Sequence, residues 1–376
     1  MSRFNSVQKT MTSLFAATIL AGLLIAGCAQ ATPAPAPTAT PAAPKSAEPT
    51  KAAAPTTAPA APTKAPTVAP TAPPKVIYPE KGKTITYISP YAPGGSDQIV
   101  RLMQPSLEKE LGVPLSIVNK EGAGSQVGTT EIALAKPDGY TIGYTSIPTV
   151  NTIYLDPARK AAFSRKDLQP LTMHSIGYNM LVVKADSPFK SVKDFVDAAK
   201  ANPGKITIAS TGVGSITHMG ILQFEQVAGI DLSIVQFNGS GPSVTALLGG
   251  HVDAFSTDLG NIASQVKGGQ IRGLGIMAPE RSKFAPDVPT FTEQGYPNTD
   301  SPNIRGFVMP AGAPREIIDT LVAAFKKSQA DPQVIATLEN QYYNLHYAPP
   351  EEFAKVWDEW DKKVGPLLEL VKKDTQ

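Results

Sequence analysis

Four glycine-rich loops are the part of this sequence best suited to bind a ligand. They span residues 89–97, 119–126, 210–218 and 238–242, and we name them the first, second, third and fourth glycine loops. Each loop follows a predicted strand and opens a predicted helix, the place where open α/β sheets bind ligands. Glycine lets the backbone approach a ligand closely, and the N–H groups at a helix start carry partial positive charge. Together the loops predict a site for a small carboxylate, held by neutral donors with no need for a dedicated arginine.

The candidate ligand-binding residues come from these loops and from further strand ends. Ser146, Thr149 and Asp258 lie at such strand ends, and Asp258 is explained equally well as a helix cap. His218 lies on the helix that the third loop opens. The full predicted set is Tyr91, Ala92, Gly94, Gly95, Ser96, Asp97, Gly124, Ser125, Gln126, Ser146, Thr149, Ser210, Thr211, Gly214, Ser215, His218, Asn238, Gly239, Ser240 and Asp258.

Signatures of catalysis and of metal binding are missing from the sequence. The histidines lack metal-ligand spacing such as His-Glu-x-x-His, and no Gly-x-Ser-x-Gly elbow of a serine hydrolase occurs. We therefore predict that the protein is not an enzyme and has no catalytic residue, no metal site and no cofactor.

The elements that must position the loops alternate between short β-rich runs and amphipathic helices. Predicted strands cover residues 84–88, 115–118, 141–145, 181–183, 206–208, 234–237, 254–255, 274–276 and 306–308. Predicted helices cover residues 96–111, 126–135, 192–201, 215–227, 242–248, 261–267, 315–327 and 351–372. Pro105 is expected to kink the first of these helices or to begin a second one. This alternation indicates an α/β fold with mostly parallel sheets.

The start of the chain predicts export and a lipid anchor. Arg3 and Lys9 precede an apolar run at residues 14–27, which is too short to span a bilayer. The run closes with Ile25-Ala26-Gly27 followed by Cys28, the only cysteine, and this pattern resembles a bacterial lipobox. We predict a lipoprotein signal peptide at residues 1–27 and lipidation of Cys28. Residues 28–75, rich in Ala, Pro and Thr, are predicted to be a disordered linker because they offer almost nothing to bury.

The remaining residues, 76–376, are numerous enough for two domains or one large one. A formal net charge of +2 gives no reason to expect nucleic-acid binding, and a single cysteine forbids an intrachain disulfide. Monomer is the default oligomeric state. The long stalk favours an envelope with a single membrane, on the cell surface or the periplasmic side.

An ordered set of motifs carries a family resemblance. The set consists of Ala92-Pro93-Gly94-Gly95-Ser96, Gly122-Ala123-Gly124, Lys136-Pro137-Asp138-Gly139-Tyr140-Thr141, Gly212-Val213-Gly214-Ser215 with His218, Leu248-Gly249-Gly250-His251-Val252-Asp253, and Asp287-Val288-Pro289-Thr290 with Glu293 and Gly295. The chain resembles the substrate-binding receptors of tripartite tricarboxylate transporters, also called Bug proteins, over nearly all of residues 78–376.

The resemblance implies a type II periplasmic-binding-protein fold, with two α/β lobes, a hinge and a ligand cleft between the lobes. It further implies that lobe 1 combines residues 76–176 with 303–376 and that lobe 2 covers residues 177–302. The first two glycine loops would hold a ligand carboxylate, and the other two would grip the opposite end of the ligand. Three departures from the family pattern, at Asp97, Ser125 and Phe237, prevent transfer of ligand identity from a relative.

The function expected from this resemblance is that of an extracytoplasmic lipoprotein receptor. It would capture a small organic acid, a di- or tricarboxylate or a related acid, and deliver it to the permease subunits of a tripartite transporter. Two alternatives remain open at this point: a ligand sensor that signals to a membrane kinase, and an extracellular enzyme that uses the same cleft.

Overall fold

The computed structural model of the chain describes residues 77–94 and 97–375, and all of them lie in one compact unit of residues 72–376. The predicted signal peptide, Cys28 and the linker at residues 28–75 lie outside the described residues, as do Gly95 and Ser96 of the first glycine loop.

The strands form one mixed sheet in the order β2-β1-β3-β9-β4-β7-β5-β6, and β8 and β10 each pair with β4. Their bounds are β1 Ile85–Ser89, β2 Leu115–Asn119, β3 Thr141–Ile147, β4 Leu168–Lys184, β5 Thr207–Ser210, β6 Ser233–Gln236, β7 Ala254–Asp258, β8 Ile271–Ile276, β9 Pro302–Pro310 and β10 Leu345–Ala348. β1 is parallel to β2 and β3, and β5 is parallel to β6 and β7. The expectation of mostly parallel sheets is therefore wrong for the sheet as a whole. The pairs β1–β2, β1–β3, β5–β6 and β5–β7 are parallel, whereas β9 pairs antiparallel with β3 and β4, and β4 also pairs antiparallel with β7, β8 and β10, because β4 and β9 run between the two halves.

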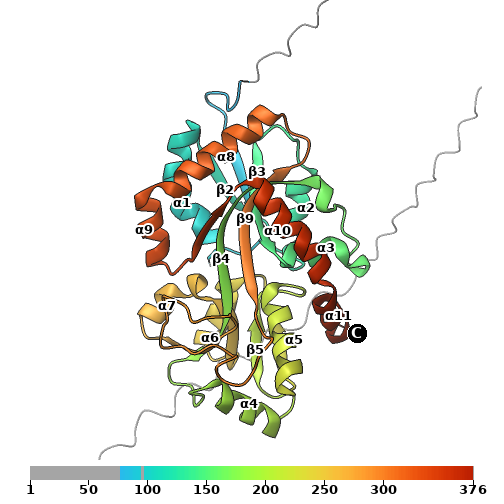
Figure 1. Cartoon of the computed structure of the whole chain (residues 1–376), viewed down its shortest axis with the longest axis vertical. Helices are drawn as coiled ribbons and strands as arrows, with labels where there is room; N and C mark the ends of the chain where they lie inside the picture. The colour runs from blue at the N-terminus through green and yellow to red at the C-terminus, as the bar shows by residue number, and fades with distance from the viewer. Residues whose placement is uncertain (1–76, 95–96, 376) are drawn as a thin grey trace, which may run out of the picture. The chain divides into compact units, whose positions relative to one another are not determined.

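β4 and β9 are antiparallel and connect the two halves of the unit (Figure 1). We call β1–β3 with α1–α3 and α8–α10 the first lobe, and β5–β8 with α4–α7 the second lobe. The helices are α1 Gln98–Leu111, α2 Gln126–Leu134, α3 Thr149–Leu155, α4 Val192–Ala201, α5 Ile216–Ala228, α6 Ser240–Leu248, α7 Ala263–Lys267, α8 Arg315–Ala330, α9 Pro332–Asn340, α10 Pro350–Lys363 and α11 Gly365–Asp374. Short 3₁₀ turns are η2 Pro157–Arg159, η3 Arg165–Asp167 and η4 Leu259–Asn261.

Each half of the sheet is covered by helices on both faces because its strands are apolar on both sides. In β1, Ile85 and Tyr87 pack into a core with α1 and α8, whereas Ile88 packs into a different core with α10. In the second lobe, Leu181 of β4 faces the core with α4 and α5, and Val182 faces the core with α6. Neighbouring residues of a strand point to opposite faces, so these runs fill two cores at once.

Helix ends follow the local chemistry of the sequence. The apolar residues spaced four apart in α1 are buried, and Gly112 ends this helix in the left-handed conformation with φ 70°. The expectation that Pro105 begins a second helix is wrong, because α1 continues through it. The single long helix predicted for residues 351–372 is also wrong. It is divided into α10 and α11 at Val364, where Pro366 occupies the first turn of the second helix.

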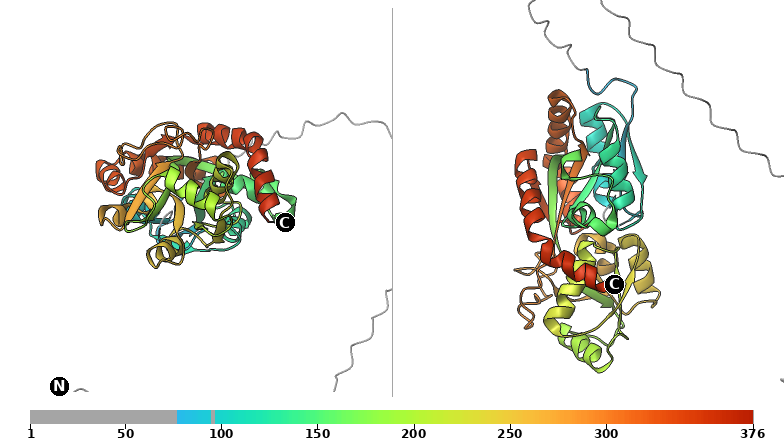
Figure 2. Two further views of the ribbon diagram at one scale, coloured as in Figure 1. Left: turned by 90° about the horizontal axis from the view of Figure 1, so that it is seen from below. Right: turned by 90° about the vertical axis from the view of Figure 1, so that its right-hand side faces the viewer.

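The last helix crosses from one lobe to the other. α10 lies against β4 and α3, whereas Val364 and Val371 pack with Ile216 and Met219 of α5. Figure 2 shows these terminal helices in red running along one side of the unit toward the C-terminus. The residue boundaries predicted for the lobes place this helix with lobe 1, and its packing is with α5 of the second lobe.

Candidate functional site

The first and fourth glycine loops meet across the two lobes. The N–H of Ala92 donates a hydrogen bond of 3.1 Å to the carbonyl of Asn238. A Cβ atom placed on Gly241 would lie 2.5 Å from the carbonyl oxygen of Pro93, so only glycine allows this approach. Gly94 and Gly239 also lie against the opposing loop, where an added Cβ would be 3.7 Å from Gly241 and 3.4 Å from Ala92, and both have a positive φ that favours glycine.

The second and third glycine loops meet beside the first pair. A Cβ on Gly124 would overlap the carbonyl oxygen of Val213, and one on Gly212 would lie 3.0 Å from the Cα of Gly124. Gly124 has φ 58° and Gly212 has φ 128°, both in the region that favours glycine. We call the contact zone of the four loops the interlobe seam.

α3 ties the first lobe to the start of α5 at this seam. The hydroxyl of Thr149 accepts a hydrogen bond of 2.9 Å from the N–H of Ile216, and the hydroxyl of Thr152 donates one of 2.9 Å to the carbonyl of Gly214. The predicted site residue Thr149 therefore lies at the seam. Ser146 lies just before α3, where its hydroxyl donates to Asn303 over 2.6 Å.

Asp97 fixes the conformation of the first glycine loop through hydrogen bonds. Asp97 is buried, and its carboxylate accepts from the N–H of Gly94 over 2.7 Å, from Arg101 over 2.8 Å and from Asn119 over 3.0 Å. All of these bonds are within the first lobe. The carboxylate of Asp97 thus holds the first glycine loop in place.

Tyr91 lies at the same loop and is buried. Burial raises the pKa of its hydroxyl, and hydrogen bonds with Ser125 and Thr149 oppose that rise. The hydroxyl therefore stays protonated at neutral pH and joins the first loop to the second. Ser125 adopts φ 76°, a left-handed conformation, as the residue before α2.

Hydroxyls organise the third loop. Thr217 accepts from the N–H of Thr211 over 2.8 Å, and its hydroxyl also lies 3.2 Å from that of Ser210 and 2.9 Å from that of Ser215. Ser215 caps α5 by accepting from the N–H of His218. Four of the predicted residues are thus brought together in one buried cluster.

His218 is hydrogen-bonded to the backbone of the third loop. Its Nδ1 accepts a hydrogen bond of 3.1 Å from the N–H of Gly214, so its proton is on Nε2, which lies 2.9 Å from a carboxylate oxygen of Asp374 in α11. Burial lowers the pKa of His218, while Asp374 acts in the opposite direction. Both ring nitrogens contact protein groups, which makes His218 a supporting residue of the third loop in this arrangement.

In the fourth loop, Ser240 accepts a hydrogen bond of 3.1 Å from Asn261. α6 begins here after Gly239, and no side chain of the described residues caps its first turn. α1 and α2 likewise begin without a side-chain cap within the part of the chain that the structure describes. Helix starts without caps are favourable positions for an anion.

Asp258 forms a buried ion pair at the strands that join the lobes. Its carboxylate lies 3.3 Å from the guanidinium of Arg305 on β9, and the two side chains are 6 % and 1 % exposed. The cap alternative for Asp258 is confirmed, because its carboxylate accepts from the N–H of Gly260 at the start of η4. A Cβ on Gly177 of β4 would overlap this carboxylate.

Sequence reasoning missed one cationic residue at the seam. Arg159, at the end of η2, donates to Gln126 over 3.2 Å and to Thr152 over 3.2 Å, and it also contacts the carbonyl of Ala123. Gln126, a predicted site residue, donates back to the carbonyl of Arg159 over 3.0 Å. No periodic or motif signal marks an arginine in a short turn, so the sequence offers no way to find it.

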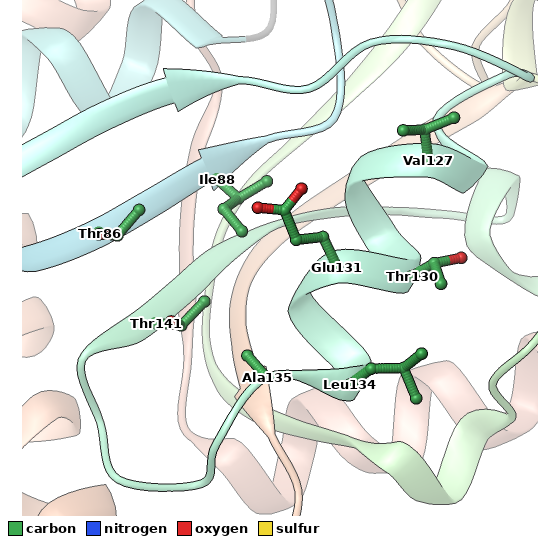
Figure 3. Close-up of a pocket in the computed structure, with 8 residues that line it drawn as sticks. All are labelled: Thr86, Ile88, Val127, Thr130, Glu131, Leu134, Ala135 and Thr141. Atoms are coloured by element: carbon green, nitrogen blue, oxygen red, sulfur yellow. The ribbon is translucent and has the colours of Figure 1, made fainter.

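Two pockets lie away from the seam. One of about 550 Å³ lies between α2 and the strands β1 and β3 (Figure 3), and its Glu131 pairs with Lys120 over 3.3 Å. Another of about 430 Å³ lies where β4 meets η4, and its lining includes Gly177, Asp258 and Asn344. Neither pocket is lined by a residue of the four glycine loops, and Asp258 is the one predicted site residue that lines either of them. The volumes of these pockets therefore do not identify the predicted site.

Among residues 77–94 and 97–375, no group of three or more His, Cys, Asp or Glu side chains is placed to hold a metal ion. No helix in the same described ranges has the length and apolar character needed to cross a membrane.

Comparison with known proteins identifies the family. A profile described as "Tripartite tricarboxylate transporter family receptor" matches residues 99–372. A protein of Cupriavidus necator, the "UPF0065 protein in gbd 5'region", is 31% identical over 294 residues, which are 76% of this chain and 87% of that protein.

Solved structures agree with this assignment. A structure titled "Structure of a periplasmic transporter" is 34% identical, with a TM-score of 0.72, and the match covers 79% of this chain and 98% of that one. MatC from Rhodopseudomonas palustris with bound malate is 26% identical, with a TM-score of 0.71 and coverage of 77% and 99%. The resemblance and the fold class predicted from the sequence are both confirmed. The chain belongs to the family of tripartite tricarboxylate transporter receptors, and it has the α/β periplasmic binding protein fold of a solute-binding receptor.

Proposed function

We propose that this protein is an extracytoplasmic, lipid-anchored receptor that captures a small carboxylate and delivers it to the permease subunits of a tripartite transporter. The observation that carries the proposal is the meeting of four glycine loops, two from each lobe, at one seam. In such a seam the backbone can contact a ligand from both sides at once.

The chemistry of the seam favours an anion. Three helices, α1, α2 and α6, start there without a side-chain cap in the described residues, and their N–H groups carry partial positive charge. Hydroxyls of Thr149 and of the third loop add neutral donors. The malate bound to MatC, a protein of similar structure, supports a dicarboxylate or a similar organic acid as the class of ligand.

Domain closure would couple ligand capture to delivery. The lobes are joined by β4 and β9, and we propose that lobe 1 comprises residues 76–176 and 303–376 and that lobe 2 comprises residues 177–302. A ligand that contacts loops of both lobes favours the closed form by its differential affinity for that form. The permease would recognise the closed surface.

A calorimetric screen of carboxylic acids against purified full-length chain tests the ligand class. Dicarboxylates, tricarboxylates, amino acids and uncharged sugars of similar size would be titrated separately. We expect heat of binding for at least one small carboxylate and none for the sugars. Folded protein that binds none of the acids would contradict the proposal.

The lipid anchor is tested by labelling. Cells that express the chain would be fed a labelled fatty acid, and we expect label in the wild type and none in the Cys28→Ala variant. Label that persists in the variant would refute anchoring at Cys28. Loss of acid uptake in a receptor deletion strain would separate transport from a purely signalling role.

A further inference from the structure

Arg159 reaches both lobes at the interlobe seam. Its guanidinium contacts Ala123, Gln126 and Thr152 of the first lobe. On the second-lobe side, a Cβ placed on Gly214 would lie 2.9 Å from Nη1 of Arg159. The charge therefore lies between the second and third glycine loops.

This guanidinium has no anionic partner among the described residues. No carboxylate oxygen in residues 77–94 and 97–375 lies within 4.0 Å of it, whereas Arg101, Arg165, Arg281, Arg305 and Arg315 each contact an Asp or Glu. Its three hydrogen-bond acceptors are all neutral oxygens. A guanidinium carries five N–H groups, so two of them have no acceptor among the described residues.

The surroundings of Arg159 make it unfavourable to keep its positive charge without an anionic partner. Partial burial lowers the pKa of Arg159, which means that the charged form is poorly solvated, and Asp156 only partly offsets this. Arg272 also lacks a carboxylate partner, but it contacts the backbone carbonyls of residues 185–189, far from the glycine loops in the sequence. Arg159 is thus distinguished by its place at the seam.

On the basis of the proposed function, we propose that Arg159 binds a second carboxylate group of the ligand and so makes the receptor select dicarboxylates over monocarboxylates. The planar fork of a guanidinium matches the two oxygens of a carboxylate, and such charge-assisted pairs are stronger than neutral hydrogen bonds. The uncapped helix starts would hold the first carboxylate, which both kinds of acid possess. A residue that only ties loops together would produce no such preference.

Calorimetry with matched acid pairs tests this assignment on the full chain. The pairs are succinate with butyrate, glutarate with pentanoate, and adipate with hexanoate, so that each pair differs in one carboxylate. For wild type we expect the dicarboxylate of the best-fitting length to bind at least about tenfold more tightly than its partner. Arg159→Gln should weaken that dicarboxylate by about 10- to 100-fold and its monocarboxylate partner by less than about threefold.

Two further variants keep the test interpretable. Arg159→Lys retains the charge without the fork and should lose part of the selectivity, and it replaces Arg159→Gln if that variant does not fold. Arg315→Gln removes an exposed arginine outside the seam and should change neither affinity.

The calorimetric results distinguish failure of the Arg159 proposal from failure of the proposed function. An equal loss for both members of a pair, or no loss at all, would overturn the role of Arg159 while leaving carboxylate binding intact. A wild type that prefers monocarboxylates would overturn it as well. A folded wild type that binds no acid of any length would overturn the proposed function itself.

Discussion

Replacing Asp258 should destabilise the protein strongly, because Asp258 neutralises a buried arginine. The ion pair with Arg305 is 3.3 Å long, and its side chains are 6 % and 1 % exposed. Asp258 raises the pKa of Arg305 against the effect of burial, so the guanidinium stays charged. Removal of one partner from a buried pair costs about 3–5 kcal/mol, because the other charge remains buried without compensation.

Urea denaturation measures this cost. With a slope of about 3 kcal/mol per molar urea, the Asp258→Ala variant should unfold at a midpoint about 1 M or more below that of wild type. Asp258→Asn removes the charge but keeps an oxygen that can accept from the N–H of Gly260. If the charge is the cause, Asp258→Asn should lose almost as much free energy of unfolding as Asp258→Ala. The exposed pair of Arg315 and Asp319 supplies a control, and Asp319→Ala should cost no more than about 0.5 kcal/mol.

The double variant provides the decisive comparison. Asp258→Ala combined with Arg305→Met removes both charges and fills much of the space, so it should recover a large part of the stability lost in Asp258→Ala. The reasoning is refuted if Asp258→Ala loses less than about 1 kcal/mol, or if the double variant is less stable than the single one.

Three further variants test other features. Gly177→Ala should lower the free energy of unfolding by about 1–3 kcal/mol, because its Cβ would overlap the carboxylate of Asp258; an unchanged urea midpoint would contradict this. Thr149→Val removes the acceptor for the N–H of Ile216 between the lobes, so calorimetry should show about tenfold weaker carboxylate binding, and an unaltered affinity would exclude this contribution. Burial raises the pKa of Glu225 to about 7 from 4.5, so between these pH values the carboxyl group is protonated in the folded state and ionised in the unfolded state. The free energy of unfolding of the wild type therefore falls as the pH rises through this range to about 7. Glu225→Gln should therefore gain stability relative to wild type from pH 5 to pH 8, and equal differences in urea midpoint at the two pH values would count against the shift.

The glycine loops and the alternation of strands and helices could be predicted from the sequence, because both depend on local chemistry. Gly112 ends α1 as predicted, and the loops come together at one seam because they lie at the ends of strands in the two halves of one sheet. The length of β4 was not predicted, since only residues 181–183 carry a clear apolar run, and α3 and α9 were missed.

Contacts between distant segments could not be predicted. Asp258 and Arg305 lie on β7 and β9, and only the folded strands bring their charges together. Arg159 reaches the seam from a three-residue turn that has no pattern of its own. The bond between His218 and Asp374 depends on α11 crossing to α5, which follows from the break at Val364.

The break between α10 and α11 gives the chain a third crossing between the lobes, in addition to β4 and β9. Two hydrogen-bonded strands resist stretching, and a helix packed at both of its ends resists being pulled away. Because of these three connections, the domain opening proposed above would disturb the fewest contacts if it were a rotation about an axis close to all three. Val364 ends α10 and precedes α11, and Gly365 and Pro366 form the first turn of α11, so any bending between the two helices during that opening would fall at these three residues.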